Sequence, residues 1–449
     1  MESVLYGYAV NGPTWAYLSA LLIVAVYFRF GRVWSSRNLD LLLLLCLSPG
    51  ALLTQSPLTR GAGFIWLLVV TALLMARAFF DPWQKWRPRF DQNMNEAGML
   101  FLGVCSLLFL GTRVASQPLP DATTQTIQRA DALIDRKILA EKDFAPPPPT
   151  AGREEAAAGE PPADDLDAGP GAAVMAAFIS YVFNEVTPRA LPTVAHLAVV
   201  IGLLWAGKST FGAAKSGVAM ATLYTLLPVT AFEVGATNHL LPAALTLWAF
   251  LLHRKPVAAG VLLGLAGATQ VFPLFLVPLW ASYYGRAGVG RFLIGFAATL
   301  AASAGSLVFV SADVQSFLRL VLGSFYPYIE MLSSEQSDGV WGGGAAWAMY
   351  RPPVVLVYFI LVAAFTAAPR PKTSEMLLAQ SVVLILATQF WVPAGGGLFI
   401  QWYLPLLLLM MFRPRLTDPF VMEEPTATVR GTTPAPPTRG GTVAAGKLR

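Results

Sequence analysis

The chain has 449 residues, of which 55% are hydrophobic and only 13% charged, with a formal net charge of +5. Soluble globular proteins carry about a quarter charged residues, so this composition excludes a typical soluble multidomain protein. Long apolar runs alternate with short charged segments, a pattern typical of a polytopic α-helical membrane protein. Runs such as 41–45 and 404–411 do not alternate in polarity, as strands of a membrane β-barrel would.

The apolar runs predict an all-α fold, a polytopic transmembrane helical bundle. A membrane-spanning helix needs about 20 residues, and on this criterion we expect about 13 spans, within a range of about 11 to 13. In chain order they cover 14–30, 41–55, 63–80, 97–116, 191–207, 216–234, 239–254, 256–270, 272–285, 290–311, 352–369, 374–392 and 398–412. The adjacent segments 256–270 and 272–285 are the shortest of these.

Basic residues at the turns set the expected orientation. They cluster after every second span, and the clusters are Arg29/Arg32/Arg37, Arg77/Lys85/Arg87/Arg89, Lys208/Lys215, Arg254/Lys255, Arg286/Arg291, Arg370/Lys372 and Arg413/Arg415. Cytoplasmic loops carry an excess of Lys and Arg, so these turns are assigned to the inside. We therefore expect a multi-pass protein of the cytoplasmic (inner) membrane, with its amino terminus outside and its carboxyl terminus cytoplasmic. No cleavable signal peptide is expected.

The spans and loops divide the chain into four parts. Residues 1–116 form a four-span block, and residues 173–415 form the membrane core. Between them, the outside loop 117–172 carries five basic and eleven acidic side chains. Its segment 121–143 has the spacing of an amphipathic interfacial helix, and 145–171 is a Pro/Ala/acid-rich linker expected to be disordered. The Thr/Pro/Gly-rich tail 416–449 is also expected to be disordered.

Several classes of site are disfavoured by residue types. Cys46 and Cys105 lie inside apolar runs, which indicates core thiols instead of a disulfide framework. The chain has three histidines and no paired Cys or His spacing typical of a metal site. Basic residues at span ends do not form a nucleic-acid patch, so no nucleic-acid partner is expected. The sequence leaves the oligomeric state open.

Polar residues at the ends of spans opposite the basic turns are the candidate site. A carboxylate there can act as general base toward a hydroxyl group, and Arg319 and Arg351 can hold a phosphate through paired donors. Further candidates for substrate contact share this expected outer position, and they are Asn238, His239, Gln270, Tyr326 and Gln401. Other interpretations stay open, because aromatic residues at span ends also suit the interfacial belt and loop carboxylates also suit solvent.

Three segments between residues 235 and 273 carry a family resemblance. They are Gly235-Ala-Thr-Asn-His-Leu-Leu-Pro, Leu251-Leu-His-Arg-Lys-Pro-Val-Ala-Ala-Gly and Gly264-Leu-Ala-Gly-Ala-Thr-Gln-Val-Phe-Pro. This region resembles the core of GT-C superfamily glycosyltransferases, especially the bacterial branch of polyprenyl-phosphate-mannose-dependent mannosyltransferases. Gln270 stands where that family often has Lys. The spacing of small residues also suits close packing of any membrane helix pair.

The resemblance implies an outside-facing site and a sugar donor linked to a polyprenyl phosphate. It implies a catalytic Asp or Glu in the first large outside loop of the core, and Glu185 and then Asp121 are the candidates. The expected activity is that of a hexosyltransferase acting on a glycan or lipid acceptor at the bilayer. No cofactor is expected beyond the lipid-linked donor, and the sequence leaves a requirement for divalent metal undetermined.

Two other functions fit the same sequence. A non-catalytic membrane scaffold of envelope assembly would use the long loop and the tail to hold partners. A transporter would place ionisable groups near the bilayer midplane and often shows inverted repeats, and Glu233 is the residue closest to that description.

Overall fold

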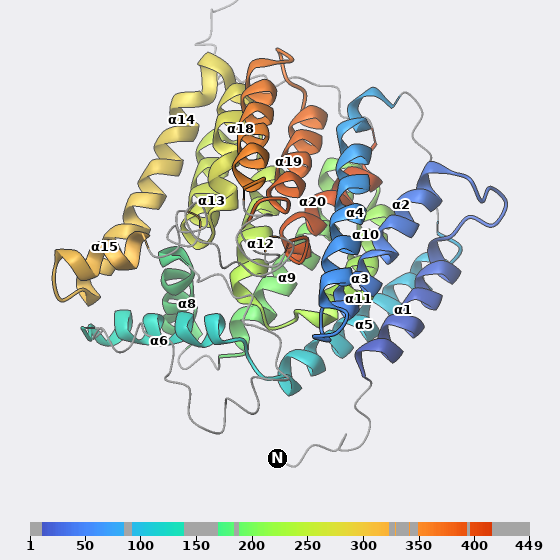
Figure 1. Cartoon of the computed structure of the whole chain (residues 1–449), viewed down its shortest axis with the longest axis horizontal. Helices are drawn as coiled ribbons and strands as arrows, with labels where there is room; N and C mark the ends of the chain where they lie inside the picture. The colour runs from blue at the N-terminus through green and yellow to red at the C-terminus, as the bar shows by residue number, and fades with distance from the viewer. Residues whose placement is uncertain are drawn as a thin grey trace, which may run out of the picture.

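The computed structural model describes residues 11–84, 92–138, 169–183, 188–322, 328, 341, 349–392 and 396–414. These residues form helices and no β-strand (Figure 1). The α-helices are α1 (Gly12–Tyr27), α2 (Ser36–Leu45), α3 (Leu47–Leu53), α4 (Arg60–Phe79), α5 (Glu96–Ser116), α6 (Asp121–Asp135), α8 (Pro170–Phe183), α9 (Ala190–Trp205), α10 (Ala214–Leu226), α11 (Pro228–Phe232), α12 (Thr237–Leu251), α13 (Pro256–Thr269), α14 (Val277–Ser306), α15 (Val314–Leu322), α18 (Arg351–Ala367), α19 (Ser374–Thr388) and α20 (Ile400–Phe412). Short turns of other helix types are η1 (Asp81–Trp83), η3 (Ala206–Thr210), η4 (Phe272–Leu276) and η5 (Leu307–Val310).

The helical fold predicted from the apolar runs is confirmed in its coarse form. Five helical segments are long and apolar enough to cross a membrane, namely Ser36–Thr54, Arg60–Trp83, Glu96–Ser116, Ala190–Thr210 and Phe272–Val310. Six shorter apolar helices of 10–17 residues accompany them. The expected number of thirteen spans stays a prediction.

Local sequence signals explain where many helices begin and break. The side chains of Asn11, Ser35, Asn95 and Thr373 each accept a backbone N–H of the helix that follows them, as good N-cap residues do. The expected span 216–234 is divided at Pro228 into α10 and α11, since proline begins a new helix more readily than it continues one. The segments expected at 272–285 and 290–311 are two arms of α14, which reverses at Gly285 in the left-handed region (φ 56°).

Two helices lie where the sequence analysis expected none. Helix α8 covers the apolar run immediately before Asn184, and α15 lies between the expected spans 290–311 and 352–369. Helix α6 covers the first part of the expected amphipathic segment and ends at Asp135, after which Arg136 takes a left-handed conformation. The expected linker 145–171 lies almost entirely, and the tail 416–449 entirely, outside the described residues.

Close backbone approach joins α13 to α14, the most extensive helix pair in the fold. A Cβ atom on Gly260 would lie 2.2 Å from the carbonyl oxygen of Phe292, and one on Gly264 would lie 2.6 Å from that of Phe296. Gly295, on the facing helix, would meet the carbonyl oxygen of Val257 at 2.6 Å. Small residues therefore let these backbones meet, as is common between membrane helices.

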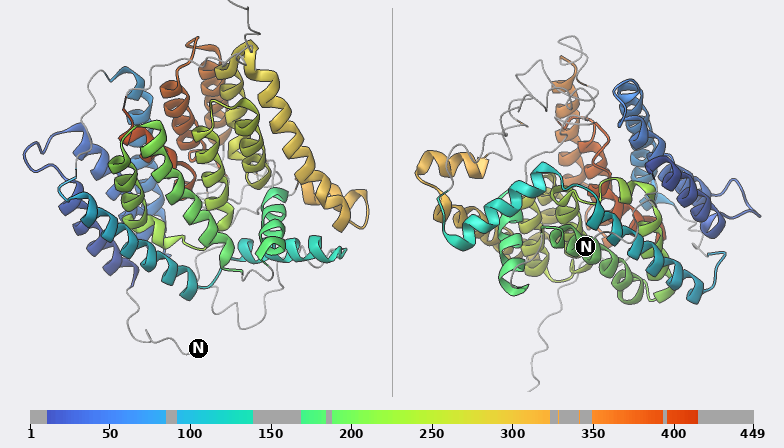
Figure 2. Two further views of the ribbon diagram at one scale, coloured as in Figure 1. Left: turned by 180° about the vertical axis from the view of Figure 1, so that it is seen from behind. Right: turned by 90° about the horizontal axis from the view of Figure 1, so that it is seen from below.

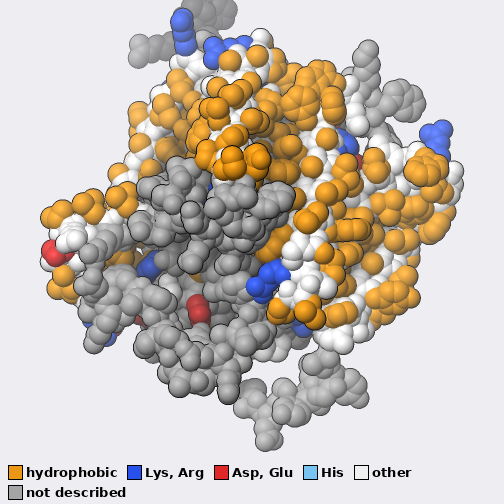
Figure 3. Space-filling view, viewed as in Figure 1, with side chains coloured by type: hydrophobic (Ala, Val, Ile, Leu, Met, Phe, Trp, Pro, Cys, Tyr) orange, Lys and Arg blue, Asp and Glu red, His pale blue; other side chains and the backbone are white. Residues whose placement is uncertain are grey.

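The outside of the bundle is strongly apolar. Large side chains such as Phe101, Leu108, Ile294 and Ile360 are more than half exposed. Figure 3 shows hydrophobic side chains over much of the visible face, with basic side chains near the upper end. Apolar surface of this extent exceeds what soluble proteins usually expose, so it indicates a lipid environment around the helices.

Candidate functional site

Side-chain contacts define two polar ends of the bundle. At the first, which we call the basic end, His253 meets Ser374 (3.1 Å between Nε2 and Oγ), and Tyr284 donates to the His253 carbonyl. The turns that follow α4, α12 and α18, the bend of α14 and the last residues of α20 meet here. Arg77, Arg254, Lys372 and Arg413 each belong to a basic cluster that the sequence assigns to one side. They lie at this one end of the structure, without this deciding which membrane face they occupy.

The opposite end, which we call the amide end, joins the starts of α12, α18 and α20 to the ends of α13 and α19. Trp402 donates through Nε1 to Nδ1 of His239 at 3.0 Å, and its ring stacks on Phe399 and Phe272 at centroid distances of 4.5 and 4.6 Å. The Gln389 side chain accepts the backbone N–H of Phe399 at 3.2 Å. Elements α12, η4, α19 and α20 are therefore held together at this end.

The Trp402 contact fixes the chemical form of His239. An indole nitrogen can only donate, so Nδ1 of His239 accepts and the ring proton of the neutral form lies on Nε2. This Nε2 lies 3.4 Å from Nδ2 of Asn238, and since both atoms are donors in this form they do not bond to each other. Both residues lie on the first turn of α12 and are almost fully buried, since Asn238 is 1% exposed and His239 is 4% exposed.

Buried amide groups at this end have hydrogen-bonding capacity that the described residues do not use. Gln270 Nε2, Gln389 Nε2 and Gln401 Oε1 have no hydrogen-bond partner in the described ranges. Each residue is only 1% exposed, although Gln401 also donates to the Val229 carbonyl at 3.2 Å. A buried polar group without a partner costs about 1–3 kcal/mol, so this end is built at an energetic cost. Such a cost is typical of positions that complete their hydrogen bonds with a ligand or ordered water.

A buried cation lies at the same end. Arg351, the first residue of α18, is 2% exposed and donates from Nε to the Trp391 carbonyl at 3.3 Å. Its guanidinium lies 6.0 Å from the centre of the Trp341 ring. Its second terminal nitrogen has no partner, and it makes no ion pair, within the part of the chain that the structure describes. A desolvated guanidinium in this state is suited to an anionic oxygen.

Helix α6, whose first residue is Asp121, lies across the lower side of the bundle beside α8 (Figures 1 and 2). The Thr123 hydroxyl donates to the Gly235 carbonyl at 2.9 Å and accepts the Thr237 N–H at 3.3 Å. These bonds fix the first turn of α6 against the turn that leads into Asn238. Asp121 lies on that first turn with an exposed side chain.

The structure brings together most of the predicted site that it describes. Asn238, His239, Gln270 and Gln401 lie at the amide end, with Asp121 and Arg351 on helices that begin there. Glu185 and Tyr326 lie outside the described residues, and Arg319 lies in α15 with its side chain undescribed. Their assigned roles, like those of the described residues, stay predictions.

The sequence analysis missed the aromatic part of this end. Phe272, Phe399 and Trp391 position the polar residues but were not named as candidates. Only their place next to Gln270, Gln401 and Gln389 in sequence was available as a signal, because an aromatic residue at a helix end is equally typical of a lipid-facing belt.

Five charged side chains at the basic end form ion pairs with one another. Arg77 pairs with Asp40 at 2.7 Å and with Asp81 at 2.9 Å, while Arg413 pairs with Asp81 and with Glu375 at 2.7 Å. In the turn before α19, burial and then nearby Arg370 lower the pKa of Lys372 to about 8. Burial also lowers the pKa of His253, which therefore stays neutral near neutral pH.

No family model, curated protein or solved structure matches this chain. Among the described residues, no group of three or more His, Cys, Asp or Glu side chains is placed to hold a metal ion. The class that the fold and surface define is a helical protein whose apolar helices suit a membrane.

Proposed function

We propose that the protein is a membrane glycosyltransferase that moves a sugar from a polyprenyl-phosphate-linked donor to a glycan or lipid acceptor. The observation that carries this proposal is the meeting of Asn238, His239, Gln270 and Gln401 at one end, where the described residues leave the buried Nε2 of Gln270 and Oε1 of Gln401 without hydrogen bonds. Hydroxyl groups of a sugar both donate and accept, so they complement such amides well. The resemblance of residues 235–273 to GT-C enzymes points to the same chemistry.

The proposed reaction is a displacement at the anomeric carbon. A carboxylate, Asp121 or Glu185, removes the proton of the acceptor hydroxyl as its oxygen attacks that carbon. The bond from the anomeric carbon to the phosphate oxygen breaks, and polyprenyl phosphate leaves with the bonding electrons. Arg351 and Arg319 stabilise the negative charge of the leaving phosphate.

The proposal includes an orientation in the membrane. Basic turns favour the cytoplasmic side, so the basic end faces the cytoplasm and the amide end faces outward. The chain is then a multi-pass protein of the inner membrane with its amino terminus outside and its carboxyl terminus inside. Labelling of single cysteines introduced at Arg286 and at Asp135 by a membrane-impermeant reagent on intact cells tests this, with only the second expected to react.

The activity is tested with the purified full chain, a panel of polyprenyl-phosphate sugars and extracted envelope glycans or lipids as acceptors, read by mass spectrometry. The expected result is sugar transfer that Asp121→Asn or Glu185→Gln lowers by about 10²–10⁴-fold, the usual contribution of a general base. Asp135→Asn is the matched control, because it removes a carboxylate from the exposed far end of the same helix. Absence of transfer with every donor overturns the function, and full activity in both carboxylate variants overturns the assignment of the base.

A further inference from the structure

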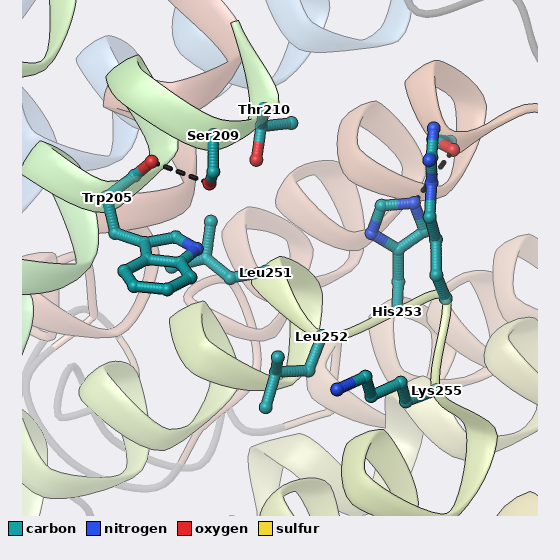
Figure 4. A pocket seen from close by; sticks show the side chains of 9 residues that line it. Trp205, Ser209, Thr210, Leu251, Leu252, His253 and Lys255 are labelled. Carbon is teal, nitrogen blue, oxygen red and sulfur yellow. Dashed lines mark hydrogen bonds between the residues drawn. The ribbon is translucent and has the colours of Figure 1, made fainter. Parts of the chain in front are cut away.

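A hollow of about 330 Å³ lies at the basic end, away from the candidate site (Figure 4). One wall is the end of α9 with η3, which contributes Trp205, Ser209 and Thr210. The other wall is the turn between α12 and α13, which contributes Arg254 and Lys255. The proposed transfer reaction uses none of these residues.

The charge in this hollow is positive and uncompensated. Arg254 and Lys255 are exposed, and neither makes an ion pair within the described ranges. No Asp or Glu lines the hollow. The nearest acid in sequence to its lining is Glu375, beside Ser374, and Glu375 pairs with Arg413. An anion entering the hollow would therefore meet two cations and no competing carboxylate in its lining.

Two hydroxyl groups, those of Ser209 and Thr210, lie on η3, and the position of this turn is fixed by packing. η3 is a π-helical turn, a feature often found at functional sites. A Cβ on its Gly207 would lie 2.2 Å from the backbone nitrogen of Gly217, so η3 and α10 are in direct backbone contact. Ser209 bonds back to the Trp205 carbonyl at 2.7 Å, which holds its hydroxyl on the wall of the hollow.

The rest of the lining is apolar. Trp205 is 52% exposed, and its ring lies 6.3 Å from that of Trp248. Figure 4 shows Trp205 and Leu251 pointing toward each other, with the Lys255 side chain extending toward Leu252. The hollow thus offers cations and hydroxyls next to an aromatic and aliphatic wall. This combination suits a molecule with a phosphate joined to a hydrocarbon chain.

We propose that this hollow binds the phosphate of an anionic phospholipid of the surrounding membrane. Arg254 and Lys255 neutralise the phosphate, Thr210 donates a hydrogen bond to one of its oxygens, and an acyl chain lies along Trp205 and Leu251. Basic pockets between membrane helices hold anionic lipid head groups by the same chemistry. The proposal is independent of the transferase activity, because it rests on the opposite end of the bundle.

Native mass spectrometry of the detergent-purified full chain tests this site. Phosphatidylglycerol, phosphatidylcholine and inorganic phosphate are titrated separately into the wild type and into Arg254→Gln/Lys255→Gln. Loss of two surface cations is expected to weaken phosphatidylglycerol binding by roughly 25-fold, with phosphatidylcholine bound weakly by both proteins. The matched control is Arg286→Gln/Arg370→Gln, which removes two charges from the same end outside the hollow and is expected to bind like the wild type.

Two further results separate the sources of phosphate. Trp205→Ala is expected to weaken phosphatidylglycerol binding, because the acyl chain loses its contact with the indole ring. If inorganic phosphate binds with the same dependence on Arg254 and Lys255 and displaces the lipid, the site serves a soluble phosphate and the lipid assignment is wrong. Equal loss of lipid in the double variant and in its control overturns the site altogether, since only general surface charge is then at work.

Discussion

The two ends of the bundle differ in how completely their polar groups are paired. At the basic end, five charged side chains from α2, α4, η1, α19 and the end of α20 form one network of ion pairs, and they are Asp40, Arg77, Asp81, Glu375 and Arg413. At the amide end, uncharged side chains are equally buried, yet several of their atoms have no partner within the described residues. The ion-pair network of the first end joins parts of the chain to one another, so that network serves stability. The second keeps hydrogen-bonding capacity for something else, which is why we place the reaction there.

The largest expected effect comes from breaking the ion-pair network with Asp81→Asn. Asp81 and Arg413 are both fully buried, and removing the carboxylate takes one of two acidic partners from Arg413 and one from Arg77. Breaking a buried pair in this way costs about 3–5 kcal/mol. We expect a large fall in the melting temperature of the purified protein, measured by scanning fluorimetry.

The control for Asp81→Asn is Asp135→Asn, whose carboxylate pairs with Lys137 where both side chains are more than half exposed. Exposed pairs contribute little, so no change in melting temperature is expected. Similar melting temperatures for the two variants would show that the buried network does not stabilise the fold.

A substitution in the helix contact between the two ends gives a loss of stability with which the effects at both ends can be compared. Gly260→Ala places a Cβ against the carbonyl oxygen of Phe292, and overpacking of this kind costs about 1–3 kcal/mol. Transfer activity per folded molecule should stay unchanged, because neither polar end is touched. Gly290→Ala is matched to it, since a Cβ there meets no neighbouring atom. It should leave the melting temperature equal or slightly higher, and equal destabilisation by both would refute the close helix contact.

At the amide end, in contrast to the substitutions above, we expect a substitution that does not lower the folding stability. Gln270→Met removes a buried nitrogen that lacks a partner in the described structure, so folding stability should stay equal or rise by about 1 kcal/mol. Sugar transfer should nevertheless fall. Thr123→Val at the same end provides the contrast, because it removes the hydroxyl that donates to the Gly235 carbonyl and accepts from the Thr237 N–H, and it should lower the melting temperature. Destabilisation by Gln270→Met with unchanged transfer would assign Gln270 a purely structural role.

The smallest expected effect is the pH dependence of stability that His253 contributes at the basic end. Burial lowers the pKa of His253 in the folded protein below its unfolded value of 6.5, so in acid the unfolded chain binds the extra proton first. The stability that His253 contributes is present above pH 6.5 and is lost as pH falls from there through the folded pKa. Melting curves from pH 8 to pH 5 should therefore diverge less from each other in His253→Gln than in the wild type. Identical pH dependence in both proteins would contradict the prediction.

Periodicity and punctuation in the sequence predicted much of the helical fold. Runs near 63–80, 97–116 and 191–207 become α4, α5 and α9, because about twenty apolar residues between charged ends suit one helix in lipid. Helix α8 was missed because it is short and adjoins a Pro/Ala/acid-rich stretch. The reversal at Gly285 inside α14 was anticipated only as a basic turn, since composition does not report backbone conformation.

The candidate site was likewise predicted only in part from the sequence. The sequence marked Asn238, His239, Gln270 and Gln401, because polar residues at the ends of apolar runs are costly in a membrane. It gave no sign that Trp402 fixes the ring form of His239, or that Arg351 is buried without an acidic partner among the described residues. The first fact depends on a contact between residues more than 100 positions apart, His239 and Trp402, and the second depends on how the start of α18 packs against the end of α19.

The low content of charged residues has two physical consequences. The sequence by itself determined a lipid-compatible helical fold and the segregation of basic residues at alternate turns, because both follow from the solvation of individual residues along the chain. Only the tertiary structure decided which of the few charges pair with one another and which polar groups are buried with bonding capacity to spare. Pairing and burial depend on the distances between helices, and side-chain packing sets those distances.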